Sequence, residues 1–216
     1  KNTATKMVYL IPKLTIIPVV KLYFKKINGI ENLPKKGTFI AAANHASYID
    51  HLIIAGCIIS HFNRKVHFLA KKEHFDNMLK AAWHTYAGAI PLDRQKGGKE
   101  ALRWGVKALK EGKIIAIHPE GTRSLTGKLQ KAKTGVARLA LLSKAPVVPI
   151  GLIGTFEILP KGKYIPRFKR AVMNIGNPMH FPVYYNKKIN KKMLRDVTNR
   201  IMKEIAKLSN QKYNYR

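Results

Sequence analysis

The sequence is poor in cysteine, and this shortage narrows the protein's possible classes. Cys57 is the one cysteine among 216 residues, so an internal disulfide is excluded and a reducing compartment is favoured. No CxxC pair or Cys/His ligand spacing is present, so no metal site is expected. The GxGxxG, HExxH and P-loop patterns are also missing, which argues against nucleotide-binding and metalloprotease sites.

Acidic residues are scarce as well. Their total of 11 stands against 41 Lys and Arg, which gives a formal net charge of +30. This imbalance predicts anionic partners: nucleic acid, an acidic membrane surface or phosphorylated substrates. The hydrophobic content of 46% is ordinary for a globular protein, and the length fits one compact domain or one domain with an attachment.

A long uninterrupted apolar run is lacking too. Residues 7–24 are mostly apolar, but two lysines interrupt them, and a bilayer-spanning helix needs about 20 apolar residues. Two prolines divide this stretch into short helical pieces. Four lysines share one helical sector: Lys6, Lys13, Lys21 and Lys25. We expect residues 1–26 to form a membrane-associating interfacial segment before a domain at 27–216; the alternative is a helix packed on the domain's own core.

The rest of the chain alternates short apolar runs with helical patterns, which is typical of an α/β fold. We expect one domain with a central mixed β-sheet flanked by helices. The predicted strands are residues 39–43, 66–70, 114–118, 147–152 and 171–175. The predicted helices are residues 48–61, 99–111, 133–143 and 186–212. Pro146 and Pro149 favour an entry or edge position for their strand. The lysine-rich face of the last helix is interpreted as solvated rather than as a second lipid contact.

A first group of reactive side chains follows the predicted strand 39–43. His45 and Asp50 lie five positions apart in the run NHASYID. A carboxylate beside a histidine can fix its tautomer and leave the other ring nitrogen free to take a proton. Ser47 and Asp50 also have the spacing of a helix capping box, a purely structural arrangement. The spacing leaves the two interpretations open, and they are compatible.

A second group, HPEGTRS, follows the predicted strand 114–118. Gly121 permits a tight turn, and Arg123 with Thr122 could hold a phosphate; an ordinary turn is the alternative. Two further cations follow other apolar runs, and each is ambiguous by itself. They are Arg94, in the run GAIPLDR, and Lys71, after residues 66–70.

Taken in order, these blocks and Val148–Ile150 (VPI) resemble the four sequence blocks of the glycerolipid acyltransferase family. The chain is most similar to bacterial lysophosphatidic acid acyltransferases, from the lead-in at residues 27–34 to the run IGNP at 175–178. The resemblance therefore covers most of the chain. One departure is His118, where the family usually has an aromatic or aliphatic residue; we interpret it as packing the strand end.

The resemblance implies residue roles. His45 is the catalytic base and Asp50 the carboxylate that orients it. The substrate-binding residues for a glycerophosphate are Glu120, Gly121, Thr122 and Arg123, assisted by Arg94 and Lys71. No enzyme nucleophile is required, because a thioester already carries a good leaving group.

The resemblance also implies a reaction and partners. A fatty acyl group passes from an acyl carrier protein or coenzyme A thioester to lysophosphatidic acid, giving phosphatidic acid. No cofactor or metal is implied, the acyl thioester being a co-substrate. We expect a peripheral or monotopic protein on the cytoplasmic face of the cell membrane, bound to an anionic membrane surface and not to nucleic acid. The alternatives are another lysolipid acceptor, or a basic noncatalytic lipid- or nucleic-acid-binding protein.

Overall fold

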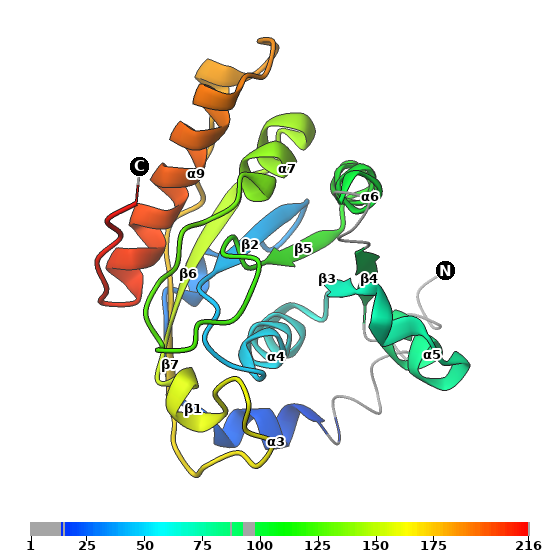
Figure 1. The fold of residues 1–216 in the computed structure, drawn as a ribbon, viewed down its shortest axis with the longest axis vertical. Helices are drawn as coiled ribbons and strands as arrows, with labels where there is room; N and C mark the ends of the chain where they lie inside the picture. Colours follow the sequence, from blue (N-terminus) through cyan, green and yellow to red (C-terminus); the bar gives the residue numbers. More distant parts are fainter. Residues whose placement is uncertain (1–13, 15, 87, 93–97, 216) are drawn as a thin grey trace.

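The structure is a computed structural model that describes residues 14, 16–86, 88–92 and 98–215 (Figure 1). Its strands are β1 (Phe24–Asn28), β2 (Phe39–Ala43), β3 (Val66–Lys71), β4 (Ala89–Leu92), β5 (Ile114–Ile117), β6 (Val147–Ile153) and β7 (Ala171–Ile175). Its α-helices are α3 (Ile16–Leu22), α4 (Asp50–Phe62), α5 (Met78–Tyr86), α6 (Lys99–Lys110), α7 (Gly135–Ser143), α8 (Thr155–Ile158) and α9 (Lys191–Leu208). Short 3₁₀ turns are η1 (Ile30–Asn32), η2 (Lys72–Phe75) and η3 (Pro182–Tyr184).

Within these residues the strands form one sheet in the order β1-β7-β6-β2-β5-β3-β4. All neighbours are parallel except β6 and β7, which are antiparallel. The expected α/β domain with a mixed sheet is therefore confirmed. Parallel neighbours matter for function, because their carboxyl ends meet at one edge of the sheet.

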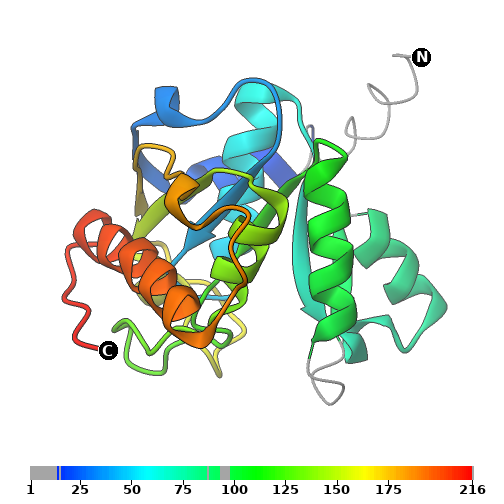
Figure 2. The same ribbon diagram turned by 90° about the horizontal axis from the view of Figure 1, so that it is seen from above.

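The central strand β2 is buried on both faces, and its side chains alternate between two cores. Ile40 and Ala42 pack in a cluster with residues of α6, α7 and α9. Phe39, Ala41 and Ala43 pack on the other face with residues of α4 and of the N-terminal side. Figure 2 shows α4 and α9 on opposite sides of the sheet. This double cover holds the carboxyl end of β2 rigidly.

All five predicted strands are present, with ends that differ by at most one residue. The two strands that sequence reasoning missed, β1 and β4, are the outer strands of the sheet. An outer strand has one neighbour and needs no continuous apolar run. The sequence of β1, FKKIN, carries two lysines, and β4 contains Pro91. Neither segment therefore shows the pattern of a buried strand.

Of the two positions predicted from Pro146 and Pro149, strand entry or sheet edge, the edge position is wrong, and Pro146 directly precedes β6. Strand β6 lies between β7 and β2 in the interior of the sheet. The β6–β7 ladder begins at the pair Ile150 and Ile175, so Pro149 stands just outside it. Its carbonyl accepts a hydrogen bond from Gly176 N at 2.9 Å. An interior strand thus tolerates this proline because its neighbour ends at that point.

The predicted helices are present, and each is shorter than predicted. Helix α4 begins at Asp50 rather than at residue 48, and α7 at Gly135 rather than at 133. Helix α9 begins five residues after the predicted start, because the Asn190 side chain caps it by accepting a hydrogen bond from Met193 N. The prediction extends the apolar periodicity over residues 186–190, which lie between η3 and α9.

The N-terminal segment is described only from residue 14 onward; the predicted positions of Lys6 and Lys13 lie outside the described residues. Helix α3 packs on the domain through buried Ile17 and Val20. Val20 lies against Gly56 of α4, where a Cβ atom would come within 3.1 Å of it. Residues 24–26, expected in the helical segment, belong instead to β1. The structure thus places part of this segment against the core.

The other face of α3 is open. Val19 and Leu22 are exposed, as is Leu14 just before the helix proper. No helix in the described ranges is long and apolar enough to cross a membrane.

Candidate active site

The two reactive blocks lie side by side because β2 and β5 are parallel neighbours. Asn44 and His45 follow β2, and the run 118–124 follows β5. The two turns are joined directly: Ser124 N donates a hydrogen bond to the His45 carbonyl at 2.8 Å. Asn44, also buried, spans to β6, where its side chain both donates to and accepts from the Leu152 backbone. The site therefore stands at the ends of buried strands in the interior of the sheet.

His45 and Asp50 form the predicted pair. The His45 Nδ1 atom lies 2.8 Å from Asp50 Oδ2, and the carboxylate is fully buried. Oδ2 also accepts the backbone N–H groups of Ala46 and Ser47, each at 2.8 Å. An oxygen that accepts all three bonds places the ring proton on Nδ1 and leaves a lone pair on Nε2. Nε2 can therefore take a proton from a bound hydroxyl.

Asp50 serves the structural interpretation as well as the chemical one. Its bond to Ser47 N is half of a capping box. The other half is missing, because Ser47 Oγ instead donates to the Leu159 carbonyl at 2.7 Å. The two interpretations left open by the spacing are thus combined in one carboxylate, which holds both the turn and the imidazole.

Burial dominates the ionisation of the pair. It lowers the pKa of His45 to about 3, and the neighbouring His51 and Arg123 act in the same direction. Burial also raises the pKa of Asp50, while nearby His118, the N–H groups of Ser47 and Ala46 and the neighbouring Thr155 side chain oppose that rise. At neutral pH the imidazole is therefore uncharged, the form that a general base requires.

Glu120 faces into the protein. It is 3% exposed; Oε1 accepts from His45 N, and Oε2 from Gln130 N, each at 2.8 Å. The Gln130 side chain adds a longer bond at 3.3 Å. Burial raises the pKa of Glu120 to about 7, and these backbone bonds act against that rise. Both oxygens are engaged within the protein, which leaves the side chain no open face toward a substrate.

The rest of this block is more open. Thr122 is exposed and Arg123 is half-buried, with its guanidinium 3.4 Å from the centroid of the Tyr48 ring. Gly121 has φ +72°, and a side chain there would meet the methylene groups of Lys133 at about 3.2 Å. The missing side chain leaves space for the Lys133 ammonium group. Two cations, Arg123 and Lys133, thus flank the turn that follows β5.

His118 is closer to the chemistry than its interpretation as strand-end packing implied. Its ring stacks on the His45 ring, with centroids 3.9 Å apart and planes 8° apart. Its Nδ1 lies 3.1 Å from the carbonyls of Ala43 and Asn44, so Nδ1 carries the proton. Nε2 is buried without a hydrogen-bond partner. Burial lowers the pKa of His118 to about 3, helped by His45. The ring therefore does pack the strand end, and it also supports the base.

A cavity of about 490 Å³ opens beside these two rings. His45, His118, Gly121 and Lys133 line its polar end. Its other walls are largely apolar and come from β5, α6 and α7, with Ala101, Leu102, Ile117, Val136 and Leu139 among them. A pocket with a reactive polar end and an apolar body suits an amphipathic ligand.

Two predicted substrate-binding residues remain, Lys71 and Arg94. Lys71 ends β3, one strand away from β5, and its side chain is not described. Arg94 lies outside the described residues. The described residues contain no group of three or more metal-ligating side chains.

Sequence reasoning missed three residues of the site. They are Tyr48 under Arg123, Gln130 beside Glu120, and Lys133 near Gly121. Each is a common residue in an unremarkable context, and its partner is brought close only by the fold.

Known proteins resemble this chain throughout. The family model Acyltransferase matches residues 25–153. A 1-acyl-sn-glycerol-3-phosphate acyltransferase of Bacillus subtilis is 32% identical over 155 residues, 72% of this chain and 73% of that protein. One of Streptococcus pneumoniae is 27% identical over 198 residues, 88% of this chain and 70% of that protein.

A solved structure gives the same result for the fold. The crystal structure of the 1-acyl-sn-glycerophosphate acyltransferase PlsC from Thermotoga maritima superposes with a TM-score of 0.72 at 25% identity. It covers all of this chain, which spans 86% of the solved chain. The family model alone matches more than half of the sequence, including His45, Asp50 and the block after β5. The chain belongs to the acyltransferase family.

Proposed function

We propose that the protein is a 1-acyl-sn-glycerol-3-phosphate O-acyltransferase, which transfers a fatty acyl group from a thioester to lysophosphatidic acid. The observation that carries the proposal is the neutral His45 imidazole, oriented by buried Asp50 at the polar end of an apolar cavity. The names of the relatives in Bacillus and Streptococcus support the same acceptor.

In the proposed reaction His45 is the general base. Its Nε2 takes the proton of the acceptor hydroxyl as that oxygen attacks the thioester carbonyl. The carbon–sulfur bond then breaks, and the thiolate leaves with the proton that His45 returns. Asp50 stabilises the imidazolium that exists between these events, because its Oδ2 faces Nδ1. A general base of this kind contributes about 10²–10⁴ in rate.

The acceptor phosphate is proposed to bind at the turn after β5. Arg123 offers a planar fork of donors whose orientation is fixed by the Tyr48 ring. Thr122 lies on the same turn as Arg123. Lys133 lines the cavity. Glu120 is instead proposed to be a positioning residue, because its carboxylate accepts hydrogen bonds from His45 N and Gln130 N. This differs from the direct substrate contact that the family resemblance implied.

The apolar cavity between α6 and α7 is proposed to hold the acyl chain. Its opening beside His45 would bring the thioester carbonyl to the base. The donor is an acyl carrier protein or coenzyme A thioester, and the protein is proposed to work at the cytoplasmic surface of the membrane. Acylation of a different lysolipid remains the second candidate, because a phosphate and a hydroxyl are common to several lysophospholipids.

An acyl-transfer assay tests the proposal. Purified protein with an acyl thioester and lysophosphatidic acid should release free thiol and form phosphatidic acid in equal amounts. Each donor, carrier protein and coenzyme A, is run against several lysolipid acceptors. Turnover with another acceptor but not with lysophosphatidic acid supports the second candidate. Absence of turnover with every donor and acceptor contradicts the enzyme assignment.

A further inference from the structure

The segment between α8 and β7 is the most exposed apolar surface near the site. All ten residues 161–170 are exposed, and we call residues 159–170 the basic aromatic loop. It carries five cations and no acidic residue: Lys161, Lys163, Arg167, Lys169 and Arg170. Between them stand Tyr164, Ile165 and Phe168, which are 85%, 84% and 96% exposed. Large apolar side chains grouped this openly mark a contact surface rather than a solvated loop.

The loop backbone has a defined shape. Arg167 N donates to the Ile158 carbonyl at 2.9 Å, and Lys163 N to the Pro160 carbonyl at 3.2 Å. The Arg170 side chain donates to the Leu22 carbonyl at 3.0 Å. These bonds close the loop at both ends, so its apolar side chains are presented outward by a fixed turn.

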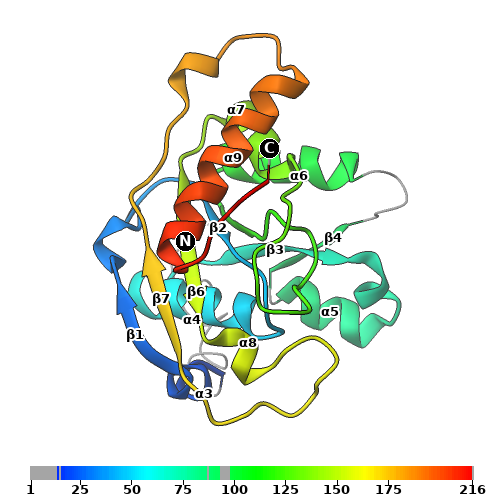
Figure 3. The same ribbon diagram turned by 60° about the vertical axis from the view of Figure 1, so that its left-hand side comes forward.

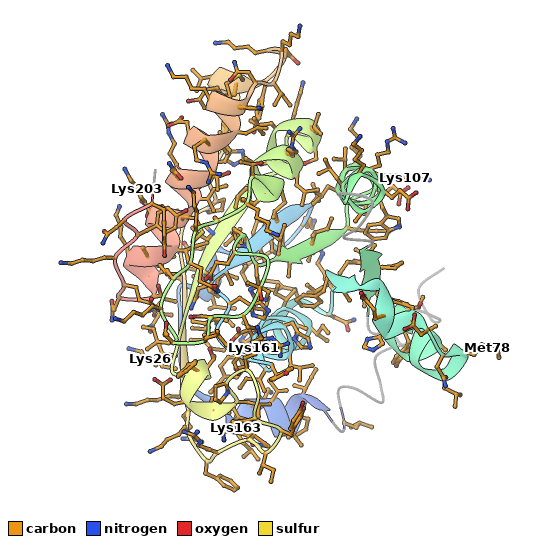
Figure 4. The ribbon with its side chains drawn as sticks, in the orientation of Figure 1. Lys26, Met78, Lys107, Lys161, Lys163 and Lys203 are labelled. Carbon is orange, nitrogen blue, oxygen red and sulfur yellow. The ribbon has the colours of Figure 1, made fainter. Side chains whose placement is uncertain are left out.

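The loop lies beside α3 at one end of the molecule (Figures 1 and 3). That helix exposes Val19 and Leu22. Lys161 and Lys163 lie at this end, whereas Lys203 lies on α9, farther along the molecule (Figure 4). Two segments more than 130 residues apart in sequence therefore lie side by side, and both expose apolar side chains at this end of the molecule.

This surface is joined directly to the catalytic turn. The Leu159 carbonyl accepts hydrogen bonds from Ser47 Oγ at 2.7 Å and from Tyr48 N at 3.2 Å. The Tyr164 ring is 6.5 Å from the Tyr48 ring, on which Arg123 stacks. A partner that contacts Tyr164 is therefore linked to Arg123, the proposed phosphate-binding residue, through the Tyr48 ring.

We propose that the basic aromatic loop docks the protein on an anionic lipid bilayer, with Ile165 and Phe168 entering the headgroup region. The cations then meet lipid phosphates, and Tyr164 lies at the interface where amphipathic rings are favoured. The docked loop would present a membrane lipid to Arg123 and His45, and this consequence rests on the proposed function. The docking of the loop on the bilayer does not depend on the proposed function.

A bilayer fits this surface better than a folded partner does. The apolar side chains project from the loop, and no loop residue lines the cavity beside His45 or the one formed by residues 126–130 and 211–215. Projecting apolar side chains with cations around them suit a fluid anionic bilayer, because a bilayer does not need a surface shape complementary to the loop. An acidic protein, such as an acyl carrier, is the other partner that five cations could attract, and the experiment separates the two.

The test is co-sedimentation with vesicles of phosphatidylcholine containing 30 mol% phosphatidylglycerol, against vesicles of phosphatidylcholine alone. The charge variant is K161Q/K163Q/K169Q and the apolar variant is I165S/F168S. Neutralising three cations should lower the partition coefficient on anionic vesicles by about 10²-fold. The apolar variant should lower it about tenfold or more on both vesicle types. All these side chains are exposed, so the thermal unfolding midpoint should be unchanged.

Matched controls come from the other end of the molecule. The charge control is K191Q/K192Q/K203Q, which removes the same net charge from exposed positions of α9. The apolar control is V183S, an exposed residue of η3. Each should change binding by less than threefold. An α9 variant that loses as much binding as the loop variant overturns the proposal, because the attraction would then be a property of total charge.

Two further outcomes also decide the matter. Loop variants that bind vesicles normally but show a raised KM for acyl carrier protein overturn the bilayer proposal in favour of a protein partner. Loop variants that lose vesicle binding but keep kcat on a water-soluble short-chain acceptor support it. Sedimentation needs no turnover, so a wild-type protein that binds through the loop yet acylates nothing refutes the proposed function and leaves the docking intact.

Discussion

The polar cluster around His45 and the basic aromatic loop use charged side chains in opposite ways. In the cluster, Asp50 and Glu120 are buried, and five backbone or ring N–H groups surround their oxygens. In the loop, five cations stand exposed without any acidic neighbour in the segment. The few acidic residues of the site thus act inside the fold, as acceptors that fix turns, while the cations face outward.

This contrast refines the meaning of the +30 net charge. Buried carboxylates that accept several hydrogen bonds stabilise one geometry, and the loss of one partner leaves donors unsatisfied. Exposed cations gain little from the fold and act on partners through the surrounding field. Mutations in the cluster should therefore change kcat and stability, and mutations in the loop should change binding to a surface.

The largest expected effect comes from removing the base. H45A should lower kcat/KM by roughly 10²–10⁴, because the acceptor hydroxyl then has no group to take its proton. D50N should also lower kcat strongly, since a neutral amide, even with its oxygen at the Oδ2 position, no longer stabilises the imidazolium that forms during the reaction. Thiol release under saturating donor measures both. H180A, at an exposed histidine, is the control, and full activity in H45A contradicts the assignment.

The second effect concerns the proposed phosphate ligand, which stands between the two regions. R123A should raise the KM for lysophosphatidic acid about 10- to 100-fold, the usual worth of a hydrogen-bonded charge, with a smaller change in kcat. R123K should recover only part of this loss, because an ammonium lacks the planar fork and the stack on Tyr48. Steady-state kinetics with varied acceptor separates KM from kcat. R103A, on the exposed face of α6, serves as control; an unchanged KM in R123A removes Arg123 from the phosphate site.

A third experiment decides whether Glu120 contacts the substrate directly or positions the backbone around His45. E120Q should lower kcat about tenfold and the free energy of unfolding by about 1–3 kcal/mol, because an amide NH₂ would face one of the two N–H donors. The KM for the acceptor should stay the same. Urea unfolding and acceptor kinetics give these values, with the exposed E157Q as control. A raised KM with unchanged kcat and stability would return Glu120 to direct contact with substrate.

The sequence predicted the His45–Asp50 pair because both residues lie on one turn, where spacing and geometry are closely related. It predicted the five inner strands because burial on two faces requires apolar runs. The family resemblance implies substrate contact for Glu120. No local pattern predicts its bonds with His45 N and Gln130 N, because the β2–β5 pairing brings these partners to it. The basic aromatic loop was not identified either. Its significance depends on exposure and on its place beside Tyr48, and both are properties of the fold.

The smallest effect on catalysis is expected at His118, the ring that stacks on the base. H118F keeps a flat ring against His45, so kcat should stay within a few-fold of wild type. H118A leaves a void beside the base and should lower kcat more. If the two variants lose activity equally, the imidazole of His118 matters for more than its shape.

Stability against acid provides the second measurement on H118F. Burial holds the pKa of His118 near 3 in the fold, against 6.5 when unfolded, so the unfolded chain binds one more proton between these values. The stability linked to His118 is therefore fully present above pH 6.5 and is lost as the pH falls through this window. Glu120 acts in the opposite direction between about pH 4.5 and 7, because its pKa is raised. H118F should thus reduce the slope of unfolding free energy against pH by about 1.4 kcal/mol per pH unit between pH 4 and 6. Urea titrations of wild type, H118F and the exposed control H180A measure this slope. An unchanged slope in H118F would mean that His118 is charged in the folded protein, and a charged ring stacked on His45 would be incompatible with a passive support for the base.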